Sequence, residues 1–255
     1  MRKGEHLVVT GSSGAIGGAL ARALRRRHPD ARLTLVDVSE APSRTLAGAL
    51  GGEVAVAPCD LADSAAALRA LDEARARFGA VHGLVNCAGF MEVRRFDRTP
   101  WARAAELLAV DLVSPLALMH AAVGDMVQAR RGFVVNVASM AGKVTLPGCA
   151  FYGAAKAGLS MASEIARREL GELGVRVVTV YPGAITSALE ARARDQYGRT
   201  LLTRLVPTGE PDVLARKIIE ALDGGRARVV YPSFYALGLF GIAGPLALAF
   251  GPAAR

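Results

Sequence analysis

Short, uninterrupted apolar runs alternate along this chain with longer stretches in which apolar residues recur at helical spacing. Such runs are typical of strands buried on both faces, and their alternation with helices favours a parallel sheet covered on both sides. We expect strands near residues 6–10, 32–37, 53–57, 81–86, 132–138, 175–181 and 227–231. We expect helices near 15–28, 43–50, 63–78, 99–130 (two helices with a break near 111–115), 151–173 and 211–223.

This pattern predicts an α/β fold, a single-domain Rossmann-type doubly wound parallel sheet of about seven strands flanked by helices. The chain has 255 residues and 52% hydrophobic content, which suits one domain with a large core. We expect a dinucleotide-binding and catalytic domain over residues 1–232 and an apolar tail over 233–255. Within the domain, residues 184–209 form an unusually long connection, which we interpret as a lid.

A glycine-rich loop directly follows the first predicted strand and opens the first predicted helix. Gly11 would permit the tight turn, Gly14 close backbone approach, and Gly17 close packing of the helix on the strand. The free N–H groups of the helix N-terminus would then hold a pyrophosphate. The next strand ends in Asp37, whose carboxylate can accept hydrogen bonds from ribose hydroxyls and repels a 2′-phosphate. The sequence therefore predicts NAD in preference to NADP.

A second cluster of chemistry lies in the second half of the chain. Tyr152 and Lys156 are four residues apart on a predicted helix, so both side chains can point into one cleft. A cation near the phenol would lower the pKa of Tyr152 from its free value of about 10 and make it an acid/base near neutral pH. Ser139, at the end of an apolar run, could hold a carbonyl or alcohol oxygen.

Taken in order, these motifs resemble the single-domain branch of the short-chain dehydrogenase/reductase family over roughly residues 5–232. The resemblance implies that Asp60 meets the adenine, that Lys156 binds the nicotinamide ribose, and that Ser139 orients the substrate for Tyr152. It places the cofactor at Gly11, Ser12, Ser13, Gly14, Ile16, Gly17, Asp37, Asp60, Leu61, Asn86, Ala88, Gly89, Tyr152, Lys156, Pro182, Gly183, Ile185 and Thr186.

The chain departs from the family pattern at two positions. Gly14 comes one residue early, with Ala15 after it, and we expect little effect because alanine is small. Asp111 stands where the family commonly has an asparagine that holds a water linking the lysine to solvent. Its carboxylate keeps an acceptor oxygen and would favour a charged Lys156. The candidate catalytic residues are thus Ser139, Tyr152, Lys156 and Asp111.

Segments that follow strands should line the substrate pocket. Met91, Met140, Leu146 and Leu189 lie in such segments and would make an apolar wall, although ordinary packing explains them equally well. We interpret the chain as an NAD-dependent oxidoreductase that interconverts a secondary alcohol and a ketone, on a hydrophobic or lipid-like substrate. Two alternatives stay open: a non-catalytic NAD(H)-binding sensor or scaffold, and an NADPH-dependent 3-oxoacyl-type ketoreductase.

The remaining features bear on partners and location. The net charge of +8 is scattered, so we expect no nucleic-acid partner, and the three cysteines and four histidines form no metal motif. We expect a cytoplasmic homodimer or homotetramer with no signal peptide. The apolar residues 233–252 leave open packing on a subunit or the pocket, peripheral contact with the inner face of a membrane, and a bilayer span.

Overall fold

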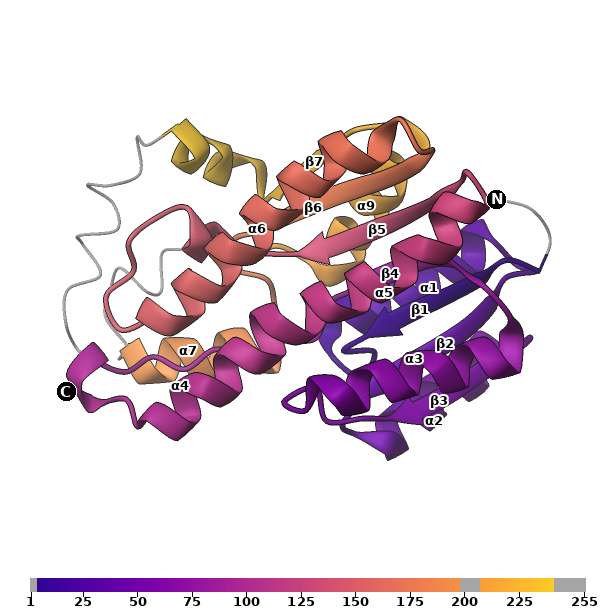
Figure 1. The fold of residues 1–255 in the computed structure, drawn as a ribbon. Helices are drawn as coiled ribbons and strands as arrows, with labels where there is room; N and C mark the ends of the chain where they lie inside the picture. Colours follow the sequence, from indigo (N-terminus) through magenta and orange to yellow (C-terminus); the bar gives the residue numbers. More distant parts are fainter. Residues whose placement is uncertain (1–3, 198–206, 241–255) are drawn as a thin grey trace.

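The computed structural model describes residues 4–197 and 207–240. A parallel seven-stranded sheet in the order β3-β2-β1-β4-β5-β6-β7 forms its centre, so the predicted fold class is confirmed (Figure 1). The order reverses between β1 and β4, which is the feature of a doubly wound sheet. The strands are β1 (His6–Thr10), β2 (Arg32–Asp37), β3 (Val54–Pro58), β4 (Val81–Asn86), β5 (Gly132–Val137), β6 (Val175–Pro182) and β7 (Arg228–Tyr231).

Helices cover both faces of this sheet. The described helices are α1 (Ala15–Arg27), α2 (Glu40–Leu50), α3 (Ser64–Phe78), α4 (Trp101–Leu108), α5 (Ser114–Gln128), α6 (Ala150–Gly171), α7 (Ala188–Tyr197) and α9 (Pro211–Asp223). Apolar side chains of α1, α2 and α9 form one buried cluster with the sheet, and those of α3, α5 and α6 form another on the opposite face. Burial on both faces explains why the strands are continuous apolar runs.

The expected break near residues 111–115 is wrong in one respect. The helix does not stop there, because α4 continues into α5 through a π-helical turn, η2 (Ala109–Val113). Pro115 lacks the N–H that would bond the carbonyl of Asp111, and widening the helix by one residue accommodates the missing bond. The turn carries Asp111, which is fully buried.

The long connection after β6 contains a helix that the hydrophobic pattern did not reveal. Most residues of α7 are good helix formers, but the helix buries only Ala193, so its apolar face is weak. The base of the connection is fastened by paired backbone bonds, from the Gly209 amide to the Ala184 carbonyl (2.8 Å) and from the Thr186 amide to the Gly209 carbonyl (2.9 Å). Residues 198–206 of the predicted lid lie outside the described residues.

Only the first part of the predicted apolar tail is described, as a 3-10 helix over Ser233–Phe240. Tyr235 packs there with Tyr181 beside the end of β6, and a Cβ on Gly183 would lie 2.1 Å from its ring. The beginning of the tail therefore covers the protein's own sheet edge. Residues 241–252, on which the membrane alternatives depend, lie outside the described residues.

One continuous helical stretch, Trp101–Gln128, is long and apolar enough to cross a membrane by length and composition, with a mean hydropathy of 1.7 in its most apolar window. It contains α4, η2 and α5 and packs against β4, α3 and α6. It also buries the charged Asp111. These contacts are those of a core helix in the middle of an α/β domain.

Candidate functional site

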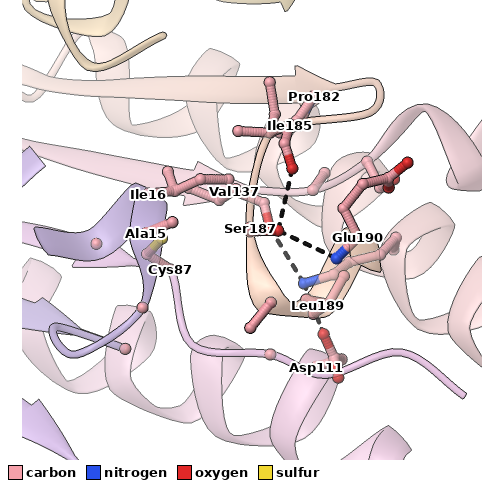
Figure 2. A pocket seen from close by; sticks show the side chains of 18 of the residues that line it. Ala15, Ile16, Cys87, Asp111, Val137, Pro182, Ile185, Ser187, Leu189 and Glu190 are labelled. Atoms are coloured by element: carbon pink, nitrogen blue, oxygen red, sulfur yellow. Dashed lines mark hydrogen bonds and ion pairs between the residues drawn. The ribbon is translucent and has the colours of Figure 1, made fainter. Parts of the chain in front are cut away.

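A cavity of about 270 Å³ opens at the carboxyl ends of β1, β4, β5 and β6 (Figure 2). This is the position where open parallel sheets bind ligands, beside the reversal of strand order. Of the predicted residues, the lining includes Gly11, Ser13, Gly14, Ile16, Gly17, Gly89, Asp111, Ser139, Tyr152, Lys156, Pro182, Gly183, Ile185 and Leu189. The cofactor loop and the candidate catalytic residues are therefore brought to one site.

The glycine loop forms a cradle that side chains would fill. A Cβ on Gly17 would lie 2.0 Å from the Gly11 carbonyl oxygen, and a Cβ on Gly11 would lie 2.6 Å from the backbone of Ala88. Gly11 also has a positive φ of 67°. By contrast a Cβ on Gly14 would meet only the Gly11 carbonyl oxygen, at 3.2 Å. The close approaches thus rest on Gly11 and Gly17, and the shift of Gly14 from the family spacing leaves the cradle intact.

The N-terminus of α1 faces this cradle with its backbone donors free of side-chain caps. Gly14 is the N-cap and makes no side-chain hydrogen bond, and no acidic residue occupies the first turn. The helix is 13 residues long, so its dipole and free N–H groups favour an anion there. The residues present fit the pyrophosphate of a dinucleotide.

Asp37 ends β2 beside the loop and is nearly buried. Its carboxylate accepts hydrogen bonds from the amides of Ser13 (2.8 Å) and Ser39 (2.9 Å). Asp60 is exposed and accepts from the Ala62 amide at 2.9 Å. Asp37 ends β2 and Asp60 follows β3, so both carboxylates lie at carboxyl ends of strands, but neither is in the cavity lining.

Several predicted cofactor residues lie next to the cavity but not in its lining. Ser12 is buried and its hydroxyl contacts that of Ser43 at 3.1 Å. Asn86 is buried and donates to the Pro115 carbonyl and to Asn136. Besides Asp37 and Asp60, the predicted residues Leu61, Ala88 and Thr186 also lie outside the lining. Asn86 and Ala88 thus stiffen the floor of the cleft.

The candidate catalytic side chains come from the segment after β5, from α6 and from the π-helical turn η2. Ser139 follows β5 and its hydroxyl accepts from the Ala141 amide at 3.1 Å, while Tyr152 and Lys156 lie one turn apart on α6. The Lys156 ammonium lies 5.7 Å from the centroid of the Tyr152 ring and donates to the Val137 carbonyl at 3.2 Å. This arrangement brings a hydroxyl, a phenol and an ammonium to one end of the cleft.

Asp111 makes a buried ion pair with Lys156, 2.7 Å between Oδ1 and Nζ. The Asp111 side chain has no exposed area and that of Lys156 is 5% exposed. The other carboxylate oxygen accepts from the Phe90 amide at 3.1 Å. Gly89 leaves the room for this pair, because a Cβ there would lie 2.3 Å from Asp111 Oδ1 and 3.1 Å from Lys156 Nζ.

These contacts set the ionisation of the site. Burial raises the pKa of Tyr152; the Lys156 charge lowers it, and the Asp111 charge raises it again. Burial disfavours the charged form of Lys156, but the charges of Asp111 and Tyr152 outweigh it and raise its pKa. The net direction for Tyr152 is upward, so the expectation that Lys156 lowers the pKa of Tyr152 below its free value is wrong, because burial and Asp111 oppose it.

The predicted substrate residues are separated by the structure. Leu189 lines the cavity, and Met91 and Leu146 pack in an apolar cluster around Tyr152. The prediction that Met140 lines the substrate pocket is wrong. Met140 is buried in a different cluster, with Tyr181 and Ala138, because the short 3-10 helix after Ser139 turns it inward.

Sequence reasoning missed several residues of the lining. Cys87, Val137 and Ala138 directly follow or end strands β4 and β5, so the rule of carboxyl strand ends could have found them. Burial raises the pKa of the Cys87 thiol to about 12, so it stays protonated.

The segment at the start of α7 contributes two lining residues that were not predicted individually, although they lie in the predicted lid region 184–209. Ser187 directly precedes α7 and Glu190 lies in its first turn, and the Ser187 hydroxyl accepts from the Glu190 amide at 3.1 Å (Figure 2). The other end of α7 is held by Gln196, which accepts from the Val93 amide at 3.0 Å, and by Tyr197, which donates to the Pro147 carbonyl at 3.0 Å. This helix lies within the predicted lid region, and its first turn forms part of the cavity wall.

Breaking the buried pair should be costly. Asp111→Ala leaves a buried ammonium without its counter-charge, and we expect the free energy of unfolding to fall by roughly 3–5 kcal/mol. The double variant Asp111→Leu with Lys156→Met removes both charges and should recover a large part of that loss. Urea unfolding measures all three. The matched control, Arg44→Met at the exposed Glu40–Arg44 pair, should stay within about 1 kcal/mol of the unmodified protein. A loss in Asp111→Ala no larger than in this control would contradict the pairing.

Comparison with known proteins agrees with this geometry. The sequence pattern of the short chain dehydrogenase family matches residues 5–198. D-threitol dehydrogenase of Mycolicibacterium smegmatis is 33% identical over 83% of this chain and 83% of its own. The 3-oxoacyl-[acyl-carrier-protein] reductase of Bos taurus is 30% identical over 87% of this chain and 88% of its own.

Among solved structures, a metagenomic short-chain oxidoreductase in complex with NADP superposes with a TM-score of 0.74 at 29% identity. The match covers 89% of this chain and 96% of that one. These similar proteins are named as dehydrogenases, reductases or oxidoreductases, which supports an NAD(P)-dependent oxidoreductase activity for this chain. The chain belongs to the short-chain dehydrogenase family.

Proposed function

We propose that this protein is an NAD-dependent oxidoreductase that interconverts a secondary alcohol and a ketone. The observation that carries the proposal is that Ser139, Tyr152 and Lys156 line the same cavity as the glycine loop. A dinucleotide laid from the glycine cradle toward these residues would place its reactive end beside the Tyr152 phenol. A hydride and a proton can then move at the same carbon–oxygen bond.

Each residue has a distinct task in this reaction. The nicotinamide, when bound, supplies or accepts the hydride. Tyr152 gives its proton to the carbonyl oxygen or takes the proton of the alcohol, and Ser139 holds that oxygen by a hydrogen bond. Lys156 would bind the nicotinamide ribose, and its charge acts on the phenol. Pro182, Gly183 and Ile185 line the cavity and would border the nicotinamide ring.

The choice of NAD rests on Asp37. Its carboxylate ends β2 and is anchored to two backbone amides, so its charge stays in place where a 2′-phosphate would sit. The metagenomic oxidoreductase of similar structure is in complex with NADP, so a preference for NADP is the competing proposal. The electrostatic argument favours NAD.

The substrate proposal rests on the apolar cluster around Tyr152. Val93, Leu107, Leu146 and Phe151 pack there with Met91, which suits a hydrophobic or lipid-like alcohol or ketone. The bovine relative's name supports a second candidate, an NADPH-dependent 3-oxoacyl-type ketoreductase. Turnover on a panel of polyols, aliphatic ketones and 3-oxoacyl thioesters with each cofactor separates these candidates, and the absence of all turnover would favour a non-catalytic sensor or scaffold.

The phenol gives the first test of this proposal. Tyr152→Phe should keep cofactor affinity and lose about 10²–10⁴-fold in kcat, because the reacting oxygen loses its proton partner. Lys156→Ala should weaken both cofactor binding and turnover. Stopped-flow turnover and NADH fluorescence titration measure the two effects. If Tyr152→Phe kept most of the unmodified kcat, the assigned mechanism would be wrong.

The cofactor preference gives the next test. We expect NADH to bind more tightly than NADPH, and Asp37→Ser to narrow the gap by roughly tenfold or more, since like charges about 4 Å apart near a protein surface repel by about 4 kcal/mol. Asp37→Asn is the matched variant that removes the charge but retains an acceptor for the Ser13 and Ser39 amides. Fluorescence titration with both cofactors measures this, and tighter NADPH binding by the unmodified protein overturns the assignment.

We also propose that the protein is cytoplasmic and contacts a membrane peripherally through residues 233–252. Liposome flotation tests this contact.

We further propose a homodimer or homotetramer. Met161 and Ile165 are 59% and 50% exposed one turn apart on α6, and a second copy of the chain would cover them. Met161→Glu with Ile165→Glu should lower the mass in sedimentation velocity. Leu68→Glu on α3 is the control and should leave it unchanged. A monomeric unmodified protein would refute the assembly.

A further inference from the structure

The ion pair between Asp111 and Lys156 changes what the site can do with a proton. Both side chains are buried, and Lys156 Nζ lies 2.7 Å from Asp111 Oδ1. Where the family commonly has a neutral asparagine, this chain therefore places a full negative charge against the lysine. The consequence for the reaction follows from which groups are ionised.

The contacts of Asp111 match the carboxylate and not the carboxylic acid. Oδ2 accepts from the Phe90 amide, and no hydrogen-bond donor other than the ammonium reaches Oδ1 among the described residues. A protonated Asp111 would carry an O–H that needs an acceptor, and both oxygens face N–H donors instead. Lys156 likewise points its N–H groups at two acceptors, Asp111 and the Val137 carbonyl. Burial raises the pKa of Asp111, while the charge and hydrogen bond of Lys156 and the Phe90 amide oppose that rise by stabilising the carboxylate. The contacts themselves are those of an ammonium paired with a carboxylate.

Among residues 4–197 and 207–240, the groups that act on Tyr152 then sum to no net charge. Lys156 on α6 contributes one positive charge and Asp111 on η2 one negative charge. The remaining neighbours are neutral: the Ser139 hydroxyl after β5, the Cys149 thiol ahead of α6, and the Cys87 thiol beside Lys156. Burial disfavours the phenolate and Asp111 opposes it, while the charge of Lys156 and the hydrogen bond from Ser139 favour it, and burial has the largest effect.

The pair is also held in place. The carboxylate is fixed by the Phe90 amide and by the π-helical turn that carries it, and Gly89 leaves the space that any side chain would take. Lys156 Nζ is fixed by the Val137 carbonyl at the end of β5. Lys156 therefore cannot turn its charge toward the phenol without leaving Asp111 unpaired in the interior, which is strongly unfavourable.

We propose that Asp111 is a positioning residue that cancels the charge of Lys156 and keeps Tyr152 as a phenol across neutral pH, so that the site is built to reduce a carbonyl. This inference rests on the proposed function and adds the direction in which the chemistry is fast near neutrality. The equilibrium constant of the reaction is set by the substrate and the cofactor and does not depend on Asp111. Asp111 instead sets the pH range in which oxidation and reduction are fast.

The proton accounting for the two directions differs in one step. In reduction, hydride bonds to the carbonyl carbon while the Tyr152 O–H breaks and its proton bonds to the carbonyl oxygen, and the phenolate then regains a proton from solvent. The reduced cofactor is the reductant. In oxidation, Tyr152 must lose its proton to solvent before it can take the proton of the alcohol. A phenol that holds its proton therefore slows oxidation at neutral pH and leaves reduction unaffected.

Asp111→Asn tests the inference, because it is nearly isosteric and removes only the charge. The uncompensated ammonium then favours the phenolate, so the rise of kcat for alcohol oxidation with pH should move to lower pH. At pH 7 oxidation should become about tenfold faster or more, since a charge within about 4–6 Å moves an ionisation by about one pH unit or more. The alkaline fall of carbonyl reduction should move to lower pH in parallel.

The matched control is Glu106→Gln, which removes one negative charge from an exposed position on α4 near the same turn. It should leave both profiles where they are. Identical profiles for Asp111→Asn and the unmodified protein, or a move of the oxidation profile to higher pH, would overturn the proposal.

A second measurement needs neither substrate nor cofactor. Tyrosinate absorbance near 295 nm is followed against pH in the unmodified protein and in Tyr152→Phe, and the difference isolates Tyr152. We expect this difference to titrate above about pH 10, the value of a free tyrosine, and to move down when both proteins also carry Asp111→Asn. Ionisation of Tyr152 below about pH 8 in the unmodified protein would refute the inference, even if no substrate of the enzyme had been found. Absence of turnover on every substrate, with the titration as expected, would instead count against the proposed function alone.

Discussion

A single buried ion pair connects the elements on which the site depends. Asp111 lies on the π-helical turn between α4 and α5, and Lys156 lies on α6. Their remaining hydrogen bonds reach the loop after β4 through Phe90 and the end of β5 through Val137. Two helical segments and two strand ends therefore meet at one pair of opposite charges. Because neither charge can be left alone in the interior, these elements must keep their relative positions whether or not a ligand is bound.

The cofactor end of the cleft is built on a different constraint, which is close approach of backbones. The loop after β1 can meet the loop after β4 only because Gly11 carries no Cβ, and α1 can meet the loop after β1 only because Gly17 carries none. The same constraint returns at Gly89, where the absent side chain admits the Asp111 carboxylate. Three glycines thus have two roles: Gly11 after β1 and Gly17 in α1 allow the close backbone approach around the cradle, and Gly89 after β4 leaves space for a charge. The two halves of the site are joined at Gly89, which lines the cavity beside both.

How far the sequence could predict this site depends on how local each signal is. The apolar runs of β1 and β5 and the four-residue spacing of Tyr152 and Lys156 are local, and the structure has them where the pattern places them. Helix α7 was missed because it buries only one side chain and so lacks the apolar periodicity that indicates a helix. The pKa of Tyr152 was assigned the wrong direction because it depends on Asp111, which is distant in the chain, and on a depth of burial that no local spacing reveals.

The departure at position 111 is best understood together with its surroundings. A charged residue placed alone in a helix core would be strongly destabilising. Here the carboxylate has a partner for each oxygen, a turn that sets its depth, and a glycine that leaves it space. An asparagine at this position would satisfy the same backbone donor but leave the positive charge of the lysine uncompensated. The exchange of one side-chain atom therefore leaves the shape of the site nearly unchanged and alters its electrostatics, which is the property that governs where a phenol gives up its proton.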